Sequence, residues 1–549
     1  MGLSVSSSPS HQNPGSLPTA FPPCTCQMSH TTPPTPISRE RTNRRYRDQD
    51  RATVEQMRKE GVPGPFSGNV VGKILLFAES KPVIATLLAF SVVMIVWNLQ
   101  LYHDNLLSSS SCHCAATTSA RTTATFLNSS TTPLVSLSAA PFRTTGPGPN
   151  KREFKVYGNA AALFVQMGAY RGGVDTFAIV GLASKPVHVY GDPWFKCEWV
   201  PDKPGSEPVT GKSYHILPDW GYGRVYTVVV VNCTFPTNPN SDNSGGKLTL
   251  YAYYSPSHEK FEKFTALEES PGSYNESKFK APFQYDYLYC GSSLYGTLSP
   301  KRIREWMAYH TWFFGPRSHF VFHDAGGMSA KVRAVLEPWV RLGRATVQDI
   351  RDQDQFDGYY YNQFLVVNDC LHRYRYAANW TFFFDVDEYI YLPEGNSLES
   401  VMQEFSNYTQ FTIEQNPMSS YLCLNDSTQD YSRQWGFEKL LFRDSTTGTW
   451  KDRKYAIQAR LAFATGVHMS ENVVGEALHK TEDKIRYYHY HNTIQVLGEP
   501  CRVFLPPSSR WKANMFDKKP YVFDDKMKKL ADTIKWFERK TLGNFSRPA

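Results

Sequence analysis

The chain is 549 residues long and 41% apolar, which is enough for two or three folded domains. Its formal net charge of +8 is modest and partly concentrated near the N-terminus, so the charge does not indicate a nucleic-acid-binding protein. Residues up to about Arg58 are rich in Pro, Ser, Thr and Arg and offer little to bury. We therefore expect residues 1–81 to form a disordered, basic tail.

An uncharged stretch, PVIATLLAFSVVMIVWNLQL, runs from residue 82 to residue 101 and has about the length of a helix that crosses a bilayer. Lys and Arg are frequent before this stretch and absent from residues 102–120. The positive-inside rule therefore places the tail in the cytoplasm and the rest of the chain across the membrane. A cleaved signal peptide would be shorter and closer to Met1, so the sequence predicts a single-pass signal anchor.

Cysteines and glycosylation motifs agree with this topology. Eight cysteines lie scattered after the apolar stretch, which favours disulfides in an oxidising lumen over a zinc site. Asn-x-Ser/Thr triplets occur through the same region and would be glycan sites in a lumenal chain. The cysteines are Cys112, Cys114, Cys197, Cys233, Cys290, Cys370, Cys423 and Cys501. The triplets begin at Asn128, Asn232, Asn275, Asn379, Asn407, Asn425 and Asn544.

Two regions of different composition follow the predicted anchor. Residues 102–150 are rich in Ser and Thr with few large apolar residues, which is typical of a flexible stem. Residues 151–270 contain short β-rich runs, such as RVYTVVVVNCTF and KLTLYAYYS, separated by clusters of Pro, Gly and Asn. This pattern predicts a small β-sandwich, which Cys197 and Cys233 could bridge.

Aromatic residues gather in and around the loops of this predicted β-sandwich. Flat aromatic side chains offer a stacking surface for the C–H faces of sugar rings, and their polar edges can meet the hydroxyls. We therefore predict a carbohydrate-binding module, although any single Trp among these residues could instead belong to the core. The residues are Trp194, Trp199, Trp220, Tyr214 and Tyr222.

From residue 271 onwards the chain alternates between strand-like and helix-like segments. Strands are predicted at 283–290, 319–327 and 344–350, and amphipathic helices lie between them. Such alternation favours an α/β fold with a mostly parallel sheet. Asp324 and Asp349 end two of these strands, on the edge where a nucleotide would bind. The alternative is that these two carboxylates cap the helices that follow.

The stretch Trp380-Thr-Phe-Phe-Phe-Asp385-Val-Asp387-Glu388 is the strongest candidate for the chemistry. Its aromatic run is typical of a strand buried on both faces. On an extended chain Asp385 and Asp387 point to the same side, and carboxylates suit Mg²⁺ or Mn²⁺ that bridges to a diphosphate. Acids that merely end a strand in water are the alternative. A phosphatase nucleophile is less favoured, because that pattern usually has Thr or Val after the second Asp and Glu388 stands here.

Several short motifs occur in a particular order in this half of the chain: Tyr289-Cys290-Gly291, Arg304-Glu305-Trp306, His319-Phe-Val-Phe-His-Asp324, Asn368-Asp369-Cys370-Leu371, and Phe384-Asp385-Val-Asp387-Glu388. Together they resemble glycosyltransferase family 92, and most closely its plant members, the β-1,4-galactan synthases. The resemblance covers roughly residues 280–500. It implies a GT-A-type, nucleotide-sugar-binding catalytic domain at 271–549 whose Asp-x-Asp motif binds Mn²⁺ (or Mg²⁺). It also implies a type II Golgi membrane protein with a carbohydrate-binding module ahead of the catalytic domain.

The activity implied by the resemblance is transfer of galactose from UDP-α-galactose to β-1,4-galactan, a side chain of the pectin rhamnogalacturonan I. An α-linked donor and a β-linked product mean inversion, which requires one displacement and a general base for the acceptor hydroxyl. A divalent cation held by Asp385 and Asp387 would neutralise the leaving diphosphate.

The other roles are ranked by chemistry. His489 is the first choice for a further metal ligand, and His491 for the diphosphate, because late histidines often serve the metal in GT-A enzymes. Glu438, in a segment resembling the Trp-Gly-x-Glu-Lys of relatives, is favoured as the base because burial beside aromatics would raise its pKa. Glu414 is the reserve, and a structural ion pair is the alternative for Glu438. His468 is a weaker candidate for the acceptor site.

Three alternatives remain open at this point. Other family 92 members act on glycoprotein glycans, so the acceptor could differ. A membrane-tethered glycan-binding protein with an inert catalytic fold belongs to a different class, although the intact Asp385, Asp387 and His489 favour an enzyme. The basic C-terminal helix could attract acidic pectin or could simply be a solvated surface helix. A homodimer is expected only because Golgi transferases often dimerise.

Overall fold

The computed structural model describes residues 150–543, apart from 160–161, 185–193, 221–224, 256, 258, 357, 359, 427–429 and 447–451. All of these residues lie within one of the two units into which the chain divides, Leu137–Ala549. The predicted tail, the predicted membrane anchor and the predicted stem up to residue 149 lie outside the described residues. Among the residues that are described, no helix is long and apolar enough to span a bilayer.

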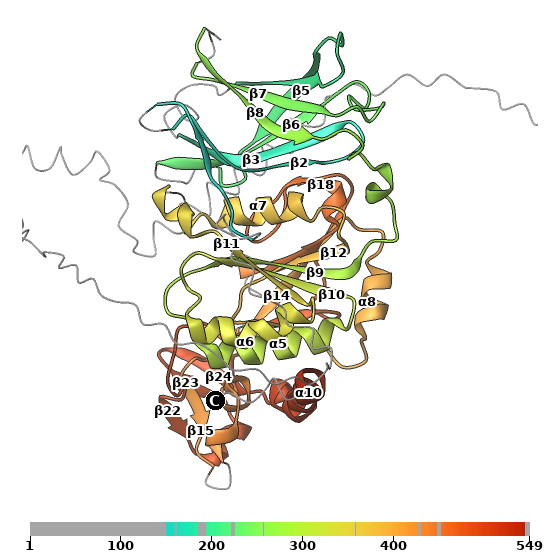
Figure 1. Cartoon of the computed structure of the whole chain (residues 1–549). Coiled ribbons are helices and arrows are strands. Elements are labelled where there is room, and N and C mark those ends of the chain that lie inside the picture. The colour runs from blue at the N-terminus through green and yellow to red at the C-terminus, as the bar shows by residue number, and fades with distance from the viewer. Residues whose placement is uncertain are drawn as a thin grey trace, which may run out of the picture. The chain divides into compact units, whose positions relative to one another are not determined.

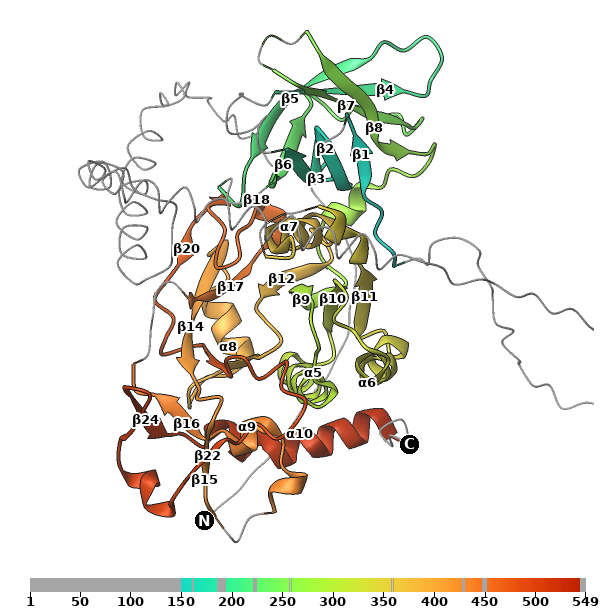
Figure 2. The ribbon, with the colours of Figure 1, turned by 90° about the vertical axis from the view of Figure 1, so that its left-hand side faces the viewer.

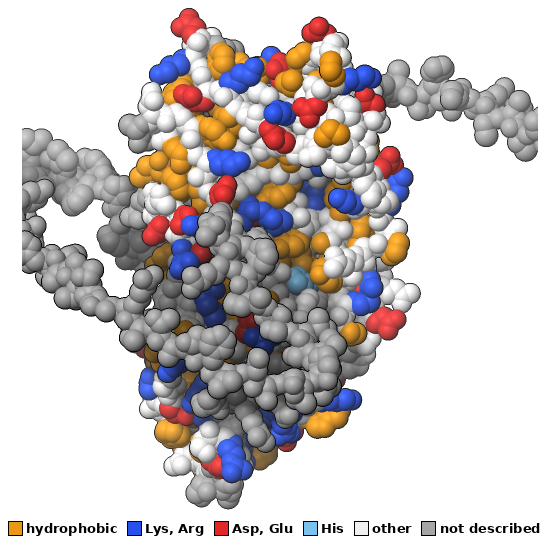
Figure 3. Space-filling model, viewed as in Figure 1, with side chains coloured by type: hydrophobic (Ala, Val, Ile, Leu, Met, Phe, Trp, Pro, Cys, Tyr) orange, Lys and Arg blue, Asp and Glu red, His pale blue; other side chains and the backbone are white. Residues whose placement is uncertain are grey.

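Eight strands of the described region form an antiparallel sheet, ordered β1-β2-β3-β6-β5-β4-β7-β8, that folds around its own core (Figure 1). We call residues 155–269 the β-domain; they fall within the range for which the sequence predicts a β-sandwich. On the face shown in Figure 3, its Lys and Arg side chains are interspersed with Asp and Glu. The strands are β1 (Lys155–Tyr157), β2 (Phe164–Arg171), β3 (Thr176–Ser184), β4 (Phe195–Pro201), β5 (Val209–Ile216), β6 (Tyr226–Thr234), β7 (Gly246–Tyr253) and β8 (Phe261–Glu269).

The central strands β3 and β6 read as continuous apolar runs because both of their faces are covered. One face, with Ile179 and Val229, packs into the core of the β-domain. The other face, with Val180 and Val228, packs against Leu365 and its neighbours in the second half of the chain. The predicted Cys197–Cys233 disulfide is present and joins β4 to β6.

The second half of the chain is built on a mixed sheet, ordered β11-β10-β9-β12-β17-β14-β21-β13 among the described residues. Its first four strands are parallel, as the alternating pattern predicts. Strand β17 then pairs antiparallel with β12. The strands are β9 (Tyr285–Leu294), β10 (Ser318–Asp324), β11 (Ala345–Asp349), β12 (Ala378–Phe383), β13 (Glu388–Tyr391), β14 (Gln410–Pro417), β17 (Lys454–Ile457), β20 (Ala477–Leu478, beside β14) and β21 (Arg486–His489). The fold class of this half is therefore α/β.

One prediction for this sheet is wrong in detail. The stretch from Trp380 to Tyr391 is not one strand: β12 ends at Phe383, and β13 begins at Glu388 at the far end of the sheet, where it pairs with β21. The turn between them holds Asp385 and Asp387. Trp306 Nε1 supports the turn by donating to the backbone oxygens of Asp385 at 3.2 Å and of Glu388 at 2.9 Å, which satisfies carbonyls on both sides of the break.

Helices cover both faces of the mixed sheet (Figures 1 and 2). Helix α7 lies between the sheet and strands β2, β3 and β6 of the β-domain, whereas α5 and α6 lie on the opposite face. The helices are α5 (Pro300–Phe314), α6 (Ala330–Arg341), α7 (Gln363–Arg373) and α8 (Leu398–Glu404). Helix α7 begins only at Gln363, because the three preceding residues, Tyr360, Tyr361 and Asn362, adopt positive φ angles and cannot form part of a helix.

A smaller C-terminal part packs under α5 through helix α10, as Figure 1 shows. Two disulfides link distant segments of the second half of the chain: Cys290–Cys370 ties β9 to α7, and Cys423–Cys501 joins β15 to the segment just before β22. The elements of the C-terminal part are β15 (Leu422–Leu424), α9 (Gly436–Lys439), β16 (Phe442–Asp444), β22 (Val503–Leu505), β23 (Asn514–Phe516), β24 (Lys519–Phe523) and α10 (Lys526–Leu542). The short strands β18 (Ala462–Ala464) and β19 (Asn472–Val473) pair with each other, and β18 lies beside β6 of the β-domain.

A buried ion pair fixes the β-domain on α7. Asp369 of α7 is fully buried, accepts from Arg152 Nη2 at 2.7 Å, and also accepts from the hydroxyl of Tyr170 on β2. Replacing Asp369 by Ala should lower the free energy of unfolding by about 3–5 kcal/mol, because Arg152 would stay buried without its partner. Denaturant melts measure this. The exposed pair of Lys151 and Asp352 nearby is the control: Asp352→Ala should barely shift the midpoint, and equal shifts would contradict the assignment.

Candidate active site

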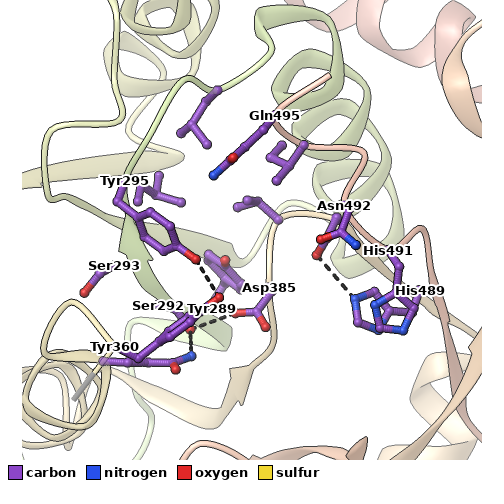
Figure 4. A pocket seen from close by; sticks show the side chains of 16 residues that line it. Tyr289, Ser292, Ser293, Tyr295, Tyr360, Asp385, His489, His491, Asn492 and Gln495 are labelled. Atoms are coloured by element: carbon purple, nitrogen blue, oxygen red, sulfur yellow. Dashed lines mark hydrogen bonds and ion pairs between the residues drawn. The ribbon is translucent and has the colours of Figure 1, made fainter. Parts of the chain in front are cut away.

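A cavity of about 410 Å³ lies at the carboxyl ends of β9 and β12, where open α/β sheets bind ligands (Figure 4). The sequence-predicted residues Asp385, Asp387, His489 and His491 all line it. The other lining residues are Tyr289, Ser292, Ser293, Leu294, Tyr295, Leu298, Tyr360, Gln363, Val386, Asn492, Ile494 and Gln495. The structure thus brings together residues that are separated by about a hundred positions in the chain.

A bulge in β9 turns Ser292 toward the acids. Cys290 pairs with Val321 and Ser293 pairs with His323, so Gly291 and Ser292 together oppose the single residue between those two on β10. Such a bulge changes the direction of a side chain next to a site. Ser292 Oγ donates to Asp385 Oδ1 at 2.7 Å and accepts from Gln363 Nε2 at 2.7 Å.

Asp385 is paired with a buried lysine that the sequence analysis missed. Lys454, at the start of β17, donates to Asp385 Oδ2 at 2.6 Å and lies 3.6 Å from Glu388 Oε1. Burial by itself would raise the pKa of Asp385, but the Lys454 ammonium outweighs it and holds the pKa at about 2. Asp385 therefore stays ionised. Phe383 of β12 pairs with Tyr455 of β17, and this register places Lys454, the residue before Tyr455, opposite the turn.

The two acids that follow are less compensated. Burial and the charge of Asp385 raise the pKa of Asp387 to about 7, and burial raises that of Glu388 well above its usual range. Glu388 Oε2 accepts from the backbone N–H of Asp385 at 2.7 Å, so this side chain closes the turn. Its Oε1 is buried and has no hydrogen-bond partner among the described residues. The turn therefore gathers more negative charge than Lys454 alone balances.

The pairing of β13 with β21 brings His489 and His491 close to this turn. Glu388 lies opposite His489 in the ladder, and His489 Nε2 is 3.7 Å from Asp387 Oδ1. The ring of His491 lies against that of His489, with centroids 3.5 Å apart and an angle of 31° between the ring planes. Burial lowers the pKa of both histidines, so both rings are neutral at neutral pH and can offer lone pairs.

The chemistry of this donor set fits a divalent cation. Two carboxylates and a neutral imidazole are the ligands that Mn²⁺ accepts, and Glu388 Oε1 is a further oxygen without a hydrogen-bond partner beside them among the described residues. In the arrangement described, Asp385 is turned to Lys454, and no group of three or more His, Cys, Asp or Glu side chains in the described part of the chain is already arranged around a metal position. A cation at this site would therefore compete with Lys454 for Asp385.

Tyrosines form the opposite wall of the cavity (Figure 4). Tyr295 stacks on Tyr361 with centroids 3.8 Å apart, and its hydroxyl donates to that of Tyr360 at 2.6 Å. Tyr360, Tyr361 and Asn362 are consecutive left-handed residues, a conformation that bulky side chains rarely adopt and that concentrates at functional sites. Asn362 holds the segment by donating to Gln353 Oε1 at 2.7 Å. The tyrosine wall offers flat stacking surfaces beside the acids.

Asp324 and Asp349 lie on the predicted edge of the sheet but not in the cavity. Asp324 is buried; it accepts from the backbone N–H groups of Gly326 and Met328 and pairs with Arg333. Asp349 is held by the side chain and backbone of Arg351. The prediction that they bind the nucleotide is therefore not supported, because each is committed to the loop that follows its own strand.

Glu438 and His468 also lie outside the lining of the cavity. Glu438 accepts from the backbone N–H of Trp435 at 2.6 Å and pairs with Lys535 of α10 at 2.5 Å, which is the structural ion pair considered as the alternative. The geometry therefore speaks against Glu438 as the base, and the reserve Glu414 does not line the cavity either. His468 Nδ1 is 2.9 Å from the backbone oxygen of Arg453, beside Lys454.

The aromatic residues predicted to bind sugars have different fates. Trp199 is fully buried and stacks on Phe177 in the core of the β-domain, so the prediction for Trp199 is wrong. Trp220 is 55% exposed, but its Nε1 donates to Glu471, so it contacts the mixed-sheet half. Trp194 is 42% exposed on the outer side of the β-domain. Tyr222 lies outside the described residues.

Trp194 belongs to an aromatic platform that sequence reasoning missed. Its ring meets Tyr253 at 5.1 Å, and Tyr253 meets Phe261, which is 43% exposed, at 5.3 Å. We call Trp194, Tyr253 and Phe261 the outer platform. Its members come from β4, β7, β8 and their flanks, and nothing in the linear sequence relates them.

Comparisons with known proteins agree on one family. The model of a family described as glycosyltransferase family 92 matches residues 285–536. The galactan β-1,4-galactosyltransferase GALS1 of Arabidopsis thaliana is 66% identical over 504 residues, which cover 89% of this chain and all of that protein. GALS2 of the same organism is 53% identical over 72% of this chain and 76% of its own length. GALS3 is 51% identical over 73% of this chain and 80% of its own.

Likeness to solved structures is weak. The galactosyltransferase LgtC in complex with donor and acceptor sugar analogues aligns with a TM-score of 0.18 and 13% identity over 32% of this chain and 58% of that chain. The bifunctional glycosyltransferase WbbM aligns with a TM-score of 0.17 and 8% identity over 28% of this chain and 27% of that one. Neither score is high enough to support an argument about the site.

Replacing Lys454 by Met should lower the free energy of unfolding of the metal-free protein by about 3–5 kcal/mol, because the buried Glu388 and the partly buried Asp385 would lose their counter-charge. Chemical denaturation in the presence of a chelator measures this loss. Lys484 is the matched control, since it pairs with Glu404 at 2.8 Å on the surface, and Lys484→Met should have little effect. A Lys454→Met protein as stable as the wild type would show that the acids are not compensated by Lys454.

Proposed function

Because the chain belongs to glycosyltransferase family 92, we propose that it is an inverting galactosyltransferase that extends β-1,4-galactan from UDP-α-galactose. The observation that carries this proposal is the convergence of Asp385, Asp387 and His489 on one cavity. The name and 66% identity of the Arabidopsis relative, matched over its whole length, support the galactan acceptor. The α/β half would then be a GT-A-type catalytic domain, and the acceptor a side chain of pectin.

We place the metal site at the turn after β12. Asp387 and His489 lie 3.7 Å apart and would hold Mn²⁺ (or Mg²⁺) together with Asp385 once Lys454 releases it. When bound, the cation would neutralise the charge that develops on the leaving diphosphate. Released from Asp385, the Lys454 ammonium remains within the same site, where it can pair with a phosphate oxygen. Neutral His491 lies next to His489 and can donate to the diphosphate.

The tyrosine wall suits the nucleoside of the donor. A planar base can stack on the ring of Tyr295 or Tyr360, and the buried hydroxyls nearby can meet the polar edge of the base or the ribose. Gln363 and Ser293 supply further polar groups on the same side of the cavity. The donor would thus lie between the tyrosines and the acidic turn, with its diphosphate over Asp385.

Inversion constrains the acceptor side. An α-linked donor that gives a β-linked product needs the acceptor hydroxyl to attack from the face opposite the diphosphate, with its proton passing to a base at the cavity. Glu438 does not reach the cavity in this structure. Glu438 is therefore not the general base in this proposal. The proton of the acceptor hydroxyl passes instead to one of the residues that line the cavity.

The β-domain would act as a carbohydrate-binding module through the outer platform. Trp194 and Phe261 expose their rings on either side of Tyr253, and each exposed ring offers an apolar face for sugar C–H groups. The apolar stretch 82–101 would anchor the protein in the Golgi membrane with the described part in the lumen. A homodimer is part of the proposal only by analogy with other Golgi transferases.

Replacing Asp385 by Asn should reduce galactosyl transfer to β-1,4-galacto-oligosaccharides by about a hundredfold or more, because the site loses the charge that opposes the diphosphate. Mass and linkage analysis of products made from UDP-galactose with Mn²⁺ measures this, and Asp324→Asn is the control that removes a carboxylate outside the cavity. If the wild-type protein makes no product and releases no UDP, it is a glycan-binding protein with an inert catalytic fold. If galactose is transferred only to glycoprotein glycans, the proposal that β-1,4-galactan is the acceptor is wrong.

Replacing Trp194 and Phe261 together by Ala should weaken binding of the full-length protein to β-1,4-galactan by about tenfold, which corresponds to roughly 1.4 kcal/mol of lost stacking. Affinity electrophoresis in galactan gels measures this. Trp536→Ala, which removes a Trp of similar exposure on α10, should leave the mobility unchanged. Unchanged mobility of the double variant would remove the outer platform from any role in galactan binding.

A further inference from the structure

A second cavity, of about 480 Å³, lies where the β-domain meets the mixed-sheet half. We call it the junction groove. Its walls are the ends of β2 and β8, the end of α7 with the residues that follow it, and the segment 273–284, which runs down the right-hand side of Figure 1. The lining residues are Tyr170, Arg171, Glu269, Ser273, Tyr274, Asn275, Ser277, Lys278, Phe279, Lys280, Pro282, Phe283, Gln284, His372, Arg373, Arg375, Tyr376 and Ala377.

A row of aromatic rings follows the junction groove. Tyr274 lies 6.3 Å from Phe279, and Phe279 lies 5.0 Å from Tyr376, measured between ring centroids. Phe283 continues the row at 6.4 Å from Tyr376. Tyr274, Phe279 and Tyr376 are partly exposed, so the row presents ring surface to the groove rather than filling a core. Successive rings of this kind suit the apolar faces of successive sugars.

The charged residues of the groove are mainly basic. Among the described residues that line it, Arg171, Lys278, Lys280, Arg373 and Arg375 face a single acid, Glu269. Glu269 is fully used by Arg171, which it contacts at 2.5 Å and 2.9 Å. Arg375 is buried; it donates to the backbone oxygens of Ala462 and Arg460 and is also hydrogen-bonded to Tyr376. Lys280 pairs with Glu276 at 2.7 Å, and Arg373 lies 3.6 Å from Asp369. The basic side chains of the groove still outnumber the carboxylates that pair with them, so net positive charge remains for an anionic ligand.

Two buried residues of the lining also have unmet hydrogen-bonding capacity. His372 Nε2 is 3.1 Å from the backbone oxygen of Phe463, which can only accept, so the proton lies on Nε2 and Nδ1 is left with a lone pair. His372 Nδ1 and Arg375 Nε have no partner among the described residues. One needs a donor and the other an acceptor. A sugar hydroxyl and a carboxylate supply these two complementary groups.

We propose that the junction groove binds a saccharide chain that carries carboxylates, that is, a uronate-containing glycan. The row of Tyr274, Phe279 and Tyr376 would stack on the sugar rings, and Lys278, Lys280 and Arg373 would pair with the carboxylates. A neutral glycan would use the aromatic row but leave the net positive charge of the groove unbalanced. A polyanion without sugar rings would do the reverse.

The junction groove is separate from the catalytic cavity and does not depend on the function proposed for it. Gln363 at the start of α7 lines the catalytic cavity, and Arg373 at the end of the same helix lines the groove. The two sites are therefore separated by the length of α7, roughly 15 Å. A glycan bound in the junction groove would lie on the same folded unit as the catalytic cavity but would not contact Asp385 or Asp387.

The test is titration of the purified full-length protein with an oligogalacturonate, followed by calorimetry or fluorescence. Lys278→Glu combined with Lys280→Glu should weaken binding by about tenfold or more, since two attractive contacts become repulsive. Both lysines are on the surface, so the variant should fold. Phe279→Ala should weaken binding as well, through the lost ring. Because Asn275 begins a glycosylation triplet at the rim, Ser277→Ala serves as the background that removes any glycan there.

The matched control is Lys526→Glu combined with Lys529→Glu on α10. Lys529 pairs with Asp525 as Lys280 pairs with Glu276, with the same spacing along the chain and an equal side-chain exposure of 69%. This control should keep its affinity for oligogalacturonate within about twofold. Asp385→Asn should also bind like the wild type even when it transfers no galactose, which separates this proposal from the proposed function.

Four outcomes would overturn the proposal. They are an absence of binding to oligogalacturonate, equal losses in the Lys278/Lys280 and Lys526/Lys529 variants, unchanged affinity of Phe279→Ala, and equally tight binding of poly-glutamate. The second outcome would mean general attraction to a basic surface, and the last would mean that the groove recognises charge alone. Preferential binding of oligogalacturonate over neutral galacto-oligosaccharide of equal length, lost in both groove variants, supports the proposal.

Discussion

The ion pair between Lys454 and Asp385 is the interaction on which the catalytic cavity depends. Three carboxylates lie within one turn of chain, one of them (Glu388) fully buried, and mutual repulsion would drive them apart or protonate them if no cation were present. The Lys454 ammonium lies 2.6 Å from one and 3.6 Å from another. Its place is set by the register of β17 against β12, and a slip of one residue would turn it to the opposite face of the sheet. The same charge imbalance that makes the turn costly to fold makes it a receptor for a divalent cation and a diphosphate.

Helix α7 connects the mixed-sheet half of the chain to the β-domain. One side of the helix packs on β9, and the other packs on β2, β3 and β6 of the β-domain. Its first residue, Gln363, hydrogen-bonds Ser292 at the catalytic cavity, while Arg373 at its end lines the junction groove. The buried pair of Arg152 and Asp369 locks the β-domain to the middle of this helix. A module that was only tethered by a linker would not keep a second glycan site at a fixed distance from the catalytic site, whereas a shared helix does.

Several residues whose type and local sequence suit a functional site serve only the fold in this structure. Asp324, Asp349, Glu438 and Trp199 all have a residue type and a local setting that suit a site, yet each is committed to the fold. Asp324 and Asp349 bind their own loops, Glu438 pairs with Lys535, and Trp199 fills the core between the two layers of the β-domain. In contrast, no sequence pattern marks Ser292, Gln363 or Lys454 as part of the site. Ser292 and Lys454 hydrogen-bond Asp385, and Gln363 hydrogen-bonds Ser292. Proximity in space is decided by pairing between strands, which a local pattern does not contain.

The sequence alone determined the α/β class of the second half, the β-rich region ahead of it, the Cys197–Cys233 bridge and the membership of family 92. It also pointed to Asp385 and Asp387, because acids at the end of a buried aromatic run suit a ligand site, and to His489 and His491 through the resemblance to GT-A enzymes. Tertiary structure alone decided that the aromatic run breaks into β12 and β13 at the two acids, and that β21 returns beside β13 to bring His489 to Asp387. It alone supplied Lys454, the tyrosine wall and the junction groove. The physical reason is that periodicity and composition report how each segment meets its immediate surroundings, whereas a site is built from contacts between segments whose sequences are independent of one another.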